Sequence, residues 1–183
     1  MDGNFYDIDD ILAEGTALPC TFTIDAVELG YLDETGESGD DLKEGTTINL
    51  PFWLISHLHP RNMIRVERPI YFQNRFADSL LVEPNVVNLR SKCEYWYILG
   101  YKLCKLMDAK EISIWMEKSL QSRNEEIIDQ SAHYKSHNFD QFRSFLTYIE
   151  QKLFDQKHET EIYMHKWKNN ITKKTLLGKR KRF

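Results

Sequence analysis

The chain has 183 residues, of which 42% are hydrophobic and 13% aromatic, which suffices for a packed core and argues against a disordered chain. The formal net charge is only −4, but residues 1–45 contain 13 acidic residues and a single lysine, whereas the remainder contains 15 acidic and 23 basic residues. This division indicates two surfaces with different partners, and an equally good alternative is that two solvated faces happen to differ in sign.

The cysteines and the apolar runs indicate the compartment. Three cysteines at wide spacing argue against a disulfide framework, and on one helix Cys93 and Cys104 would lie about 16 Å apart, too far to bridge. The first residues are acidic, unlike a secretory signal. The longest apolar run, residues 95–101, has seven residues, whereas a membrane span needs about twenty. We therefore expect a soluble intracellular protein.

The first part of the chain has the pattern of a small β-rich region. Six of the eight glycines lie in the first 45 residues, and Cys20, Phe22 and Ile24 alternate with threonines as in a strand. Pro51 and Pro60 bracket a short helix. The expected elements are a strand within residues 18–32, a polar loop at 33–45, a strand at 46–50, a helix at 51–59 and a strand at 62–69.

From Ile70 onward the apolar period becomes that of helices. The predicted helices span residues 71–82, 91–108, 110–134 and 140–168. The second is apolar on nearly every side, which predicts a buried helix. The third has an apolar stripe of Ile112, Trp115, Met116, Leu120 and Ile127, and the stripe of the fourth contains Phe142, Phe145, Ile149, Leu153 and Tyr163.

These elements predict an α+β protein with two parts. Residues 1–69 form a small β-rich domain with one short helix. Residues 70–183 form an all-α helical bundle domain that ends in a basic C-terminal tail. The boundary is expected near Pro69, without a long linker.

The sequence contains no catalytic or cofactor-binding motif. It lacks a phosphate-binding loop, a dinucleotide fingerprint, a nucleophile elbow, a paired-histidine zinc helix and a Cys-x-x-Cys pair. His57 and His59 would point about 200° apart on a helix and could share a metal ion only on a strand. We therefore expect no catalytic residue, no metal site and no cofactor, and a protein that is not an enzyme.

Near the N-terminus, acidic residues alternate with apolar ones. The spacing favours a short amphipathic helix whose acids stabilise the positive end of the helix dipole. A cation site is the alternative for the three aspartates, but docking on the protein's own domain or on a partner also accounts for the apolar positions. The residues predicted to bind a partner are Tyr6, Asp7, Ile8, Asp9, Asp10, Ile11 and Leu12.

The aromatic content is high for a lone small domain, and aromatic side chains are enriched in protein interfaces. A helix that is apolar on all sides also exceeds what one small domain can cover, so a large interface is expected in the helical part. The alternative for each ring is packing inside its own domain. The rings predicted to bind a partner are Trp53, Trp96, Tyr97, Trp115, Phe142, Phe145 and Trp167.

The chain ends in four consecutive positive charges: Lys179, Arg180, Lys181 and Arg182. Such a run suits a nuclear import signal or a contact with nucleic acid, and a solvated terminus is the alternative. An accessory module that binds nucleic acid through this end is therefore a second functional hypothesis. The acidic first third argues against strong DNA affinity, so any DNA contact is expected to be weak or indirect.

Five segments, in this order, resemble the Psf-three family of subunits of the GINS complex of eukaryotic replication forks. They are Tyr6–Leu12, Leu18–Phe22, Leu50–Leu54, Glu83–Leu89 and Lys179–Phe183. The resemblance runs over nearly the whole chain and rests most on the first segment and on the Leu-Pro-Phe-Trp-Leu element at residues 50–54.

The resemblance implies a non-catalytic structural subunit of a heterotetramer in the nucleus. Its partners would be Psf-one, Psf-two and the Sld-five protein. The tetramer would join the MCM hexamer and the Cdc forty-five protein to form the replicative helicase for initiation and elongation of DNA replication. ATP hydrolysis would belong to MCM, so the resemblance implies no small-molecule substrate and no membrane contact for this chain.

Overall fold

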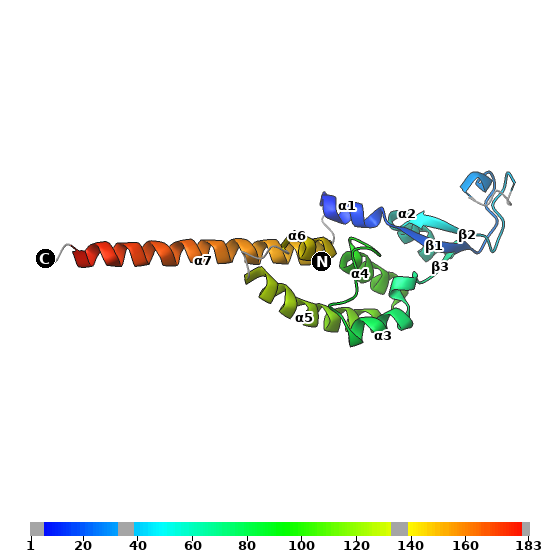
Figure 1. The fold of residues 1–183 in the computed structure, drawn as a ribbon. Coiled ribbons are helices and arrows are strands. Elements are labelled where there is room, and N and C mark those ends of the chain that lie inside the picture. The colour runs from blue at the N-terminus through cyan, green and yellow to red at the C-terminus, as the bar shows by residue number, and fades with distance from the viewer. Residues whose placement is uncertain (1–5, 33–38, 133–138, 181–183) are drawn as a thin grey trace. The chain divides into compact units, whose positions relative to one another are not determined.

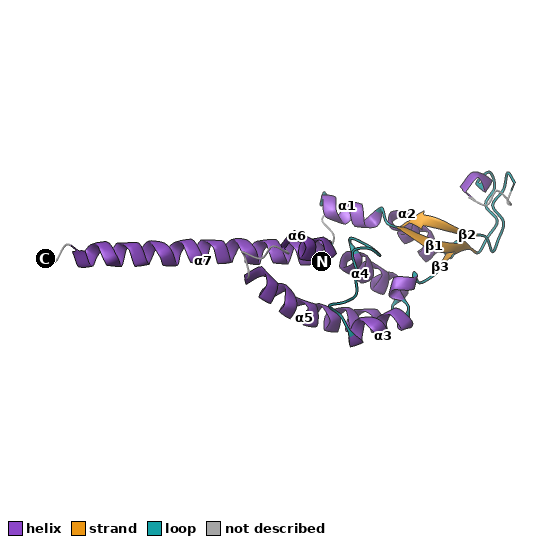
Figure 2. Cartoon of the chain, viewed as in Figure 1, coloured by secondary structure: helices purple, strands orange, loops and turns teal. Residues whose placement is uncertain are grey.

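The computed structural model describes the backbone of residues 6–32, 39–132 and 139–180, and their side chains except at 139 and 171–180. Within these ranges the protein is α+β, as predicted, with a small antiparallel sheet near the N-terminus followed by helices (Figure 2).

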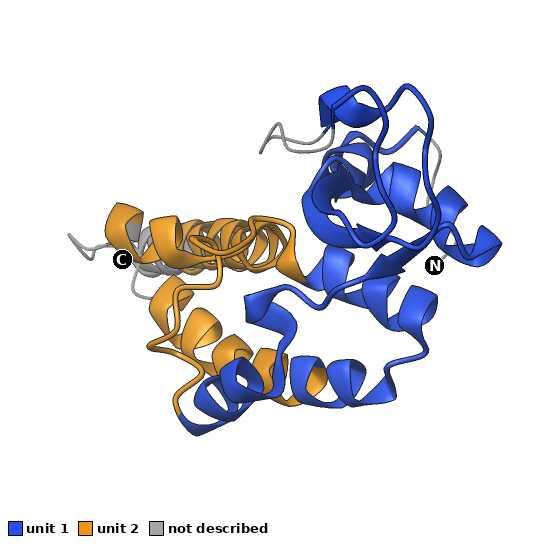
Figure 3. Ribbon diagram, turned by 90° about the vertical axis from the view of Figure 1, so that its right-hand side faces the viewer, with its two compact units in different colours: residues 1–82, 97–116 blue, residues 83–96, 117–183 orange. Residues whose placement is uncertain are grey.

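The chain divides into two compact units, coloured separately in Figure 3. Unit 1 contains residues 1–82 and 97–116, and unit 2 contains residues 83–96 and 117–183. The sheet lies wholly within unit 1. This division does not coincide with the domain boundary expected near Pro69, which stays a prediction.

The sheet has the strand order β2–β1–β3 (Figure 1). β1 (Ala17–Phe22) is central and antiparallel to both β2 (Thr47–Pro51) and β3 (Ile64–Val66). Alternate residues of β1 are buried and form one wall of the core, as the period of two predicts. The strands expected within 18–32, 46–50 and 62–69 are therefore confirmed, although β1 begins one residue earlier, β2 is shifted by one residue and β3 is shorter.

Short helices flank the strands of unit 1. They are α1 (Ile8–Glu14), the 3₁₀ turn η1 (Gly30–Leu32), α2 (Phe52–Leu58) and the 3₁₀ turn η2 (His59–Arg61). Pro51 is the N-cap of α2, and Phe52 and Ile55 of this helix are buried. The helix predicted at 51–59 is confirmed, although Pro60 lies inside η2 instead of ending α2 directly.

Two helices expected after Pro69 begin later than predicted. The segment 71–82 is interrupted because Gln73 has an extended backbone, which separates η3 (Ile70–Phe72) from α3 (Asn74–Val82). α4 spans Trp96–Met107 instead of 91–108. The N–H groups of Lys92 and Cys93 both donate to the carbonyl of Leu89, so this segment forms turns, and Cys93 does not share a helix with Cys104.

The composition of α4 predicted a helix that is buried on nearly every side, but the structure shows that one side is exposed. Its side chains at Tyr101 and Lys105 are exposed, so within this chain the helix has a solvent-facing side. The opposite side packs closely at Gly100, where a Cβ atom would lie 2.6 Å from Met116 Sδ and 2.8 Å from Phe72 Cε1. A larger residue at this position would force the Met116 side chain and the Phe72 ring to shift.

α5 (Lys110–Ala132) agrees with the helix predicted at 110–134 over its described residues. Four of the five residues in its predicted apolar stripe are buried, and Leu120 is partly buried. The stripe also contains buried polar residues that the apolar pattern did not include: Ser119, Arg123 and Ser131.

The helix predicted at 140–168 is wrong, because the chain breaks at Leu146–Thr147 into α6 (Phe139–Phe145) and α7 (Tyr148–Arg180). Glu150 Oε2 accepts a hydrogen bond from the N–H of Thr147, as in a capping box that starts a new helix. The break changes which residues are buried. Ile127, Leu146 and Phe154 form the core cluster of unit 2, whereas Phe145, Leu153 and Tyr163 of the predicted stripe are exposed.

Candidate interaction surfaces

α1 is formed by the acidic segment near the N-terminus, as predicted. Asp7 is its N-cap, and Asp7 Oδ1 accepts a hydrogen bond from the N–H of Asp9 at 3.1 Å. Asp9 and Asp10 occupy the first turn, where carboxylates stabilise the helix dipole. Ala13 is buried and α1 contacts α2, so the helix is packed on unit 1.

Lys102 of α4 binds α1 through two carboxylates. Its Nζ lies 2.7 Å from Asp10 Oδ1 and 2.6 Å from Glu14 Oε1, residues one turn apart on the same side of α1. The Lys102 side chain is only 15% exposed. Burial alone would lower the pKa of Lys102, but the hydrogen bonds that Lys102 donates to Asp10 and Glu14, together with the negative charges of these two residues, outweigh it and raise that pKa.

The apolar residues of α1 lie on the side away from Lys102. Ile8, Ile11 and Leu12 follow the spacing of three and four that places residues on one helix face, and all three are exposed, Ile8 to 70%. Tyr6 precedes the helix and is exposed as well, as is Trp53 on α2. Thus Tyr6, Trp53 and the three apolar residues of α1 form part of the surface of unit 1, whereas Asp10, from the same predicted set, faces Lys102.

Three rings predicted to bind a partner are instead buried inside this chain. Tyr97 and Trp115 belong to the core of unit 1, where the Trp115 ring lies 6.2 Å from that of Phe72. Trp96, in unit 2, is completely buried. A buried ring offers a partner little surface, so we carry the partner-binding hypothesis forward on the exposed residues.

A buried ion pair organises unit 2. Arg123 of α5 donates two hydrogen bonds to the carboxylate of Glu150 in α7, from Nε to Oε1 at 2.5 Å and from Nη2 to Oε2 at 3.0 Å. The two side chains are 5% and 0% exposed. Arg123 Nη1 also donates to the carbonyls of Pro84 and Val87 at 2.5 and 3.0 Å. The guanidinium therefore fixes the 83–89 segment that contributed to the sequence resemblance.

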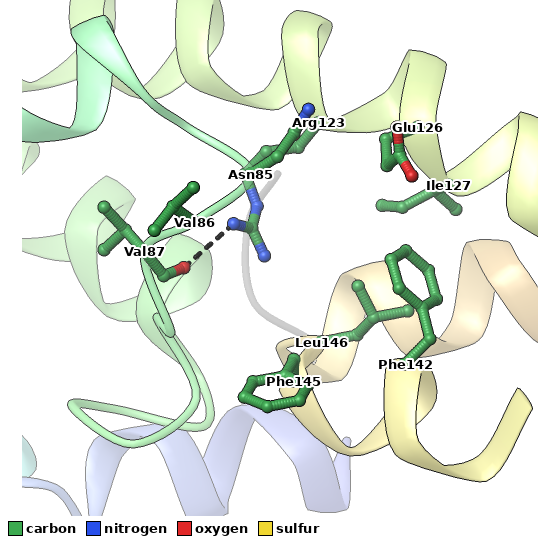
Figure 4. A pocket seen from close by; sticks show the side chains of 9 residues that line it. All are labelled: Asn85, Val86, Val87, Arg123, Glu126, Ile127, Phe142, Phe145 and Leu146. Atoms are coloured by element: carbon green, nitrogen blue, oxygen red, sulfur yellow. Dashed lines mark hydrogen bonds between the residues drawn. The ribbon is translucent and has the colours of Figure 1, made fainter. Parts of the chain in front are cut away.

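A small cavity of about 90 Å³ has Arg123 among its lining residues (Figure 4). Its volume equals that of about three water molecules and is below the 300 Å³ or more typical of ligand sites. Phe142 lines it and packs against the core cluster, and Phe145, also predicted to bind a partner, is half-exposed at its edge.

A depression of about 370 Å³ in unit 1 is lined by polar residues, namely Arg68, Gln73, Asn74 and Arg75.

Residues 163–170 of α7 are exposed on all sides. Every described side chain from Tyr163 to residue 170 is exposed, and Trp167, another predicted partner-binding residue, is 59% exposed. Figure 1 shows α7 as one long helix, and its 33 residues correspond to about 50 Å. An amphipathic helix normally obtains its stability from packing, and the described residues provide no such packing here.

The basic end lies mostly beyond the described side chains. Lys179 and Arg180 are helical in backbone at the end of α7, whereas Lys181 and Arg182 lie outside the described residues. Of the polar loop expected at 33–45, residues 33–38 lie outside them as well.

In the described part of the chain, no group of three or more histidine, cysteine, aspartate or glutamate side chains is placed to hold a metal ion. None of the helices there combines the length and apolarity that a membrane span requires.

Sequence reasoning did not identify Lys102, Arg123 or Glu150 as important residues. Lys102 and Arg123 carry no local signal, because their partners are distant in sequence. Glu150 does, since Thr147 and Glu150 have the Thr-x-x-Glu spacing of a capping box.

Comparison with known proteins adds two findings. Residues 6–59 match the family model described as the PSF3 N-terminal domain. This range contains α1, β1, β2 and α2, and therefore the exposed residues around α1 described above.

Several named proteins are similar over most of the chain. The "DNA replication complex GINS protein PSF3" of Kluyveromyces lactis is 33% identical over 67% of this chain and 72% of its own length. The protein of the same name from Aspergillus fumigatus is 28% identical over 93% of this chain and 99% of its length. A "Probable DNA replication complex GINS protein PSF3" of Dictyostelium discoideum is 29% identical over 90% of this chain, which spans only 61% of that relative.

Proposed function

The chain belongs to the PSF3 (Psf-three) family of DNA replication complex GINS proteins, and we propose that it is a non-catalytic structural subunit of the GINS heterotetramer. The family resemblance predicted from the five sequence segments is thereby confirmed. A role in DNA replication follows from the family, whose members are named for the DNA replication complex.

The proposed partners are the Psf-one, Psf-two and Sld-five subunits. Through the assembled tetramer the chain joins the MCM hexamer and the Cdc forty-five protein in the replicative helicase, in the nucleus. In this proposal the chain contributes binding surfaces and no chemistry, and ATP hydrolysis belongs to MCM.

The observation that carries the proposal is the exposed stretch 163–170 of α7. Tyr163, Met164 and Trp167 lie within five residues of one another in this stretch, which no other described part of the chain covers. Exposed aromatic and apolar side chains on an unpacked helix indicate a surface that another subunit covers, as in obligate interfaces.

Co-expression with the three other subunits, followed by size-exclusion chromatography, tests the proposal. We expect one peak that contains all four chains, and we expect Trp167→Asp to reduce the share of this chain in that peak. Tyr31→Asp is the matched control, because Tyr31 is also an exposed ring but lies in the short turn η1 of unit 1. If the chain elutes as a stable, sharply melting monomer and does not co-elute with the other subunits, its role as an obligate subunit is refuted.

The nucleic-acid hypothesis has one observation in its favour. No acidic residue follows Glu161, whereas eight basic ones do: Lys166, Lys168, Lys173, Lys174, Lys179, Arg180, Lys181 and Arg182. A gel shift of the chain with duplex DNA at two salt concentrations discriminates, because binding through these charges must weaken steeply as salt rises. Strong binding by the chain alone would favour the accessory-module alternative over the scaffold.

A further inference from the structure

α1 is packed with its charged side inward and its apolar side outward. Amphipathic surface helices ordinarily bury the apolar stripe and expose the charges. Here Asp10 and Glu14 face the partly buried Nζ of Lys102, while Ile8, Ile11 and Leu12 are exposed. Ala13 is the one apolar residue of α1 that is buried, so the packing of this small side chain and the two contacts with Lys102 together hold α1 in this orientation.

We propose that Lys102 is a positioning residue that holds α1 by its acidic side, so that Ile8, Ile11 and Leu12 are presented to a second protein whose apolar patch is bordered by lysine and arginine side chains. This inference rests on the proposed function only in taking that second protein from the replication assembly. We call these three side chains the outer face of α1.

Charge determines the kind of partner. Asp7 stands beside the outer face as the exposed N-cap residue of α1, and among the described residues no cation pairs with its carboxylate. The first 45 residues contain 13 acidic residues and one lysine, so the surrounding potential is negative. Such a surface repels the phosphates of nucleic acid and attracts a basic protein surface.

Size determines the kind of association. Three aliphatic side chains on a seven-residue helix form a patch much smaller than the interface of an obligate complex. Contacts of this size with complementary charge are typical of partners that join and leave, and their affinity falls with salt. We therefore assign the outer face to a partner outside the permanent tetramer.

The test uses the four-subunit complex with the purified MCM hexamer and Cdc forty-five protein as the binding probe. The affinity of the four-subunit complex for this probe is measured at about 0.1 M and about 0.3 M salt, because salt in this range increasingly screens interactions between exposed charges. Hydrogen exchange of residues 6–14 is followed with and without the probe. The variants are Ile11→Asp in the outer face, Lys102→Gln and Lys102→Arg at the clamp, and Val27→Asp as an exposed apolar control elsewhere in unit 1.

We expect Ile11→Asp and Lys102→Gln each to weaken probe binding about tenfold, as for central interface residues, and Val27→Asp to change it by less than about twofold. Lys102→Gln should also speed exchange at residues 6–14 in the free tetramer, and Lys102→Arg should restore both measurements. The probe should slow this exchange in the wild type, and binding should weaken as salt rises.

Each contrary result has one meaning. Failure of the wild-type chain to enter the tetramer refutes the proposed function. A tetramer that forms but binds the probe equally well with Ile11→Asp, or regardless of salt, refutes the inference alone. Loss of tetramer assembly in Ile11→Asp would place the outer face in the permanent interface, and a change in DNA binding without a change in probe binding would also overturn the proposal.

Discussion

Arg123 and Arg143 make the same two-bond contact with a carboxylate, and burial alone separates their expected effects. Arg143 of α6 binds Asp155 of α7 at 2.9 and 2.7 Å, but the two side chains are 42% and 41% exposed. The hydrogen bond from Arg143 holds the pKa of Asp155 below its usual value. This pair therefore contributes to stability above the ordinary aspartate pKa, and the contribution is lost as the pH falls through the lowered pKa.

Substitution of the buried arginine should be far more destabilising. We expect Arg123→Met to lower the free energy of unfolding by about 3–5 kcal/mol, because it leaves Glu150 buried without its counter-ion. Arg143→Met, the matched control at an exposed pair, should cost about 0–1 kcal/mol. Urea denaturation of the full chain measures both, and Arg123→Met combined with Glu150→Gln should recover part of the loss. Equal effects at the two arginines would contradict this account.

At the level of elements, the sequence shows the helices well and their interruptions poorly. Phe142, Phe145 and Ile149 keep helical spacing across Thr147, so periodicity hides the break between α6 and α7, although the Thr147–Glu150 capping box marks it. The extended Gln73 has no such local signal. The extended backbone at Gln73 accompanies the burial of the neighbouring Phe72 against Trp115. These two rings are 43 residues apart in the sequence, so local patterns carry no signal of their contact.

The start of α7 offers a test of its cap. The N–H of Thr147 binds Glu150, but the Thr147 hydroxyl is buried and has no partner among the described residues. A buried hydroxyl without a partner costs about 1–3 kcal/mol. We therefore expect Thr147→Val, which keeps the shape, to raise the free energy of unfolding by about 1 kcal/mol. A decrease, measured by thermal or urea denaturation, would mean that the hydroxyl caps the helix after all.

The second half of α7 should become ordered through assembly. Helices that lack packing are marginal in water. In the chain alone, we expect rapid amide hydrogen exchange over residues 160–170 and slow exchange around Phe154, which is buried. In the four-subunit complex, exchange over 160–170 should slow markedly. Mass spectrometry of the two samples gives the comparison, with α5 residues around Ile127 as the internal reference. Unchanged exchange would exclude this helix from the interface.

At the scale of the whole molecule, the sequence predicted the fold class and the position of α1, and the docking of α1 on a partner stays a prediction. It could not show how α1 is held, because Lys102 and Glu14 are 88 residues apart. It also could not separate buried from exposed rings, since Trp96 and Trp167 both stand in aromatic-rich helical segments. Burial depends on how helices distant in sequence pack, and composition carries no information on that.

The uneven charge of the whole chain leads to a prediction about location. Replacement of Lys179, Arg180, Lys181 and Arg182 by glutamine should reduce nuclear accumulation of a fluorescent fusion, if these residues act as an import signal. The matched control replaces Lys166, Lys168, Lys173 and Lys174, which removes the same charge without touching the run. Microscopy of both fusions gives the answer. Equal nuclear levels in both variants and the wild type would leave the basic run without a role in import.

The length of α7 also fixes the direction and the distance of Trp167 relative to the buried core of unit 2. Arg180 lies 26 residues beyond the buried Phe154, a distance of about 39 Å along the helix axis. One residue inserted between Ile162 and Tyr163, beyond the contacts that Asp155 and His158 make with the rest of unit 2, would rotate Trp167 by about 100° around that axis. Seven inserted residues would bring the ring back to nearly its first direction but about 10 Å farther out. The number of residues between Phe154 and Trp167 therefore determines both how far from the core and in which direction Trp167 is presented to a partner.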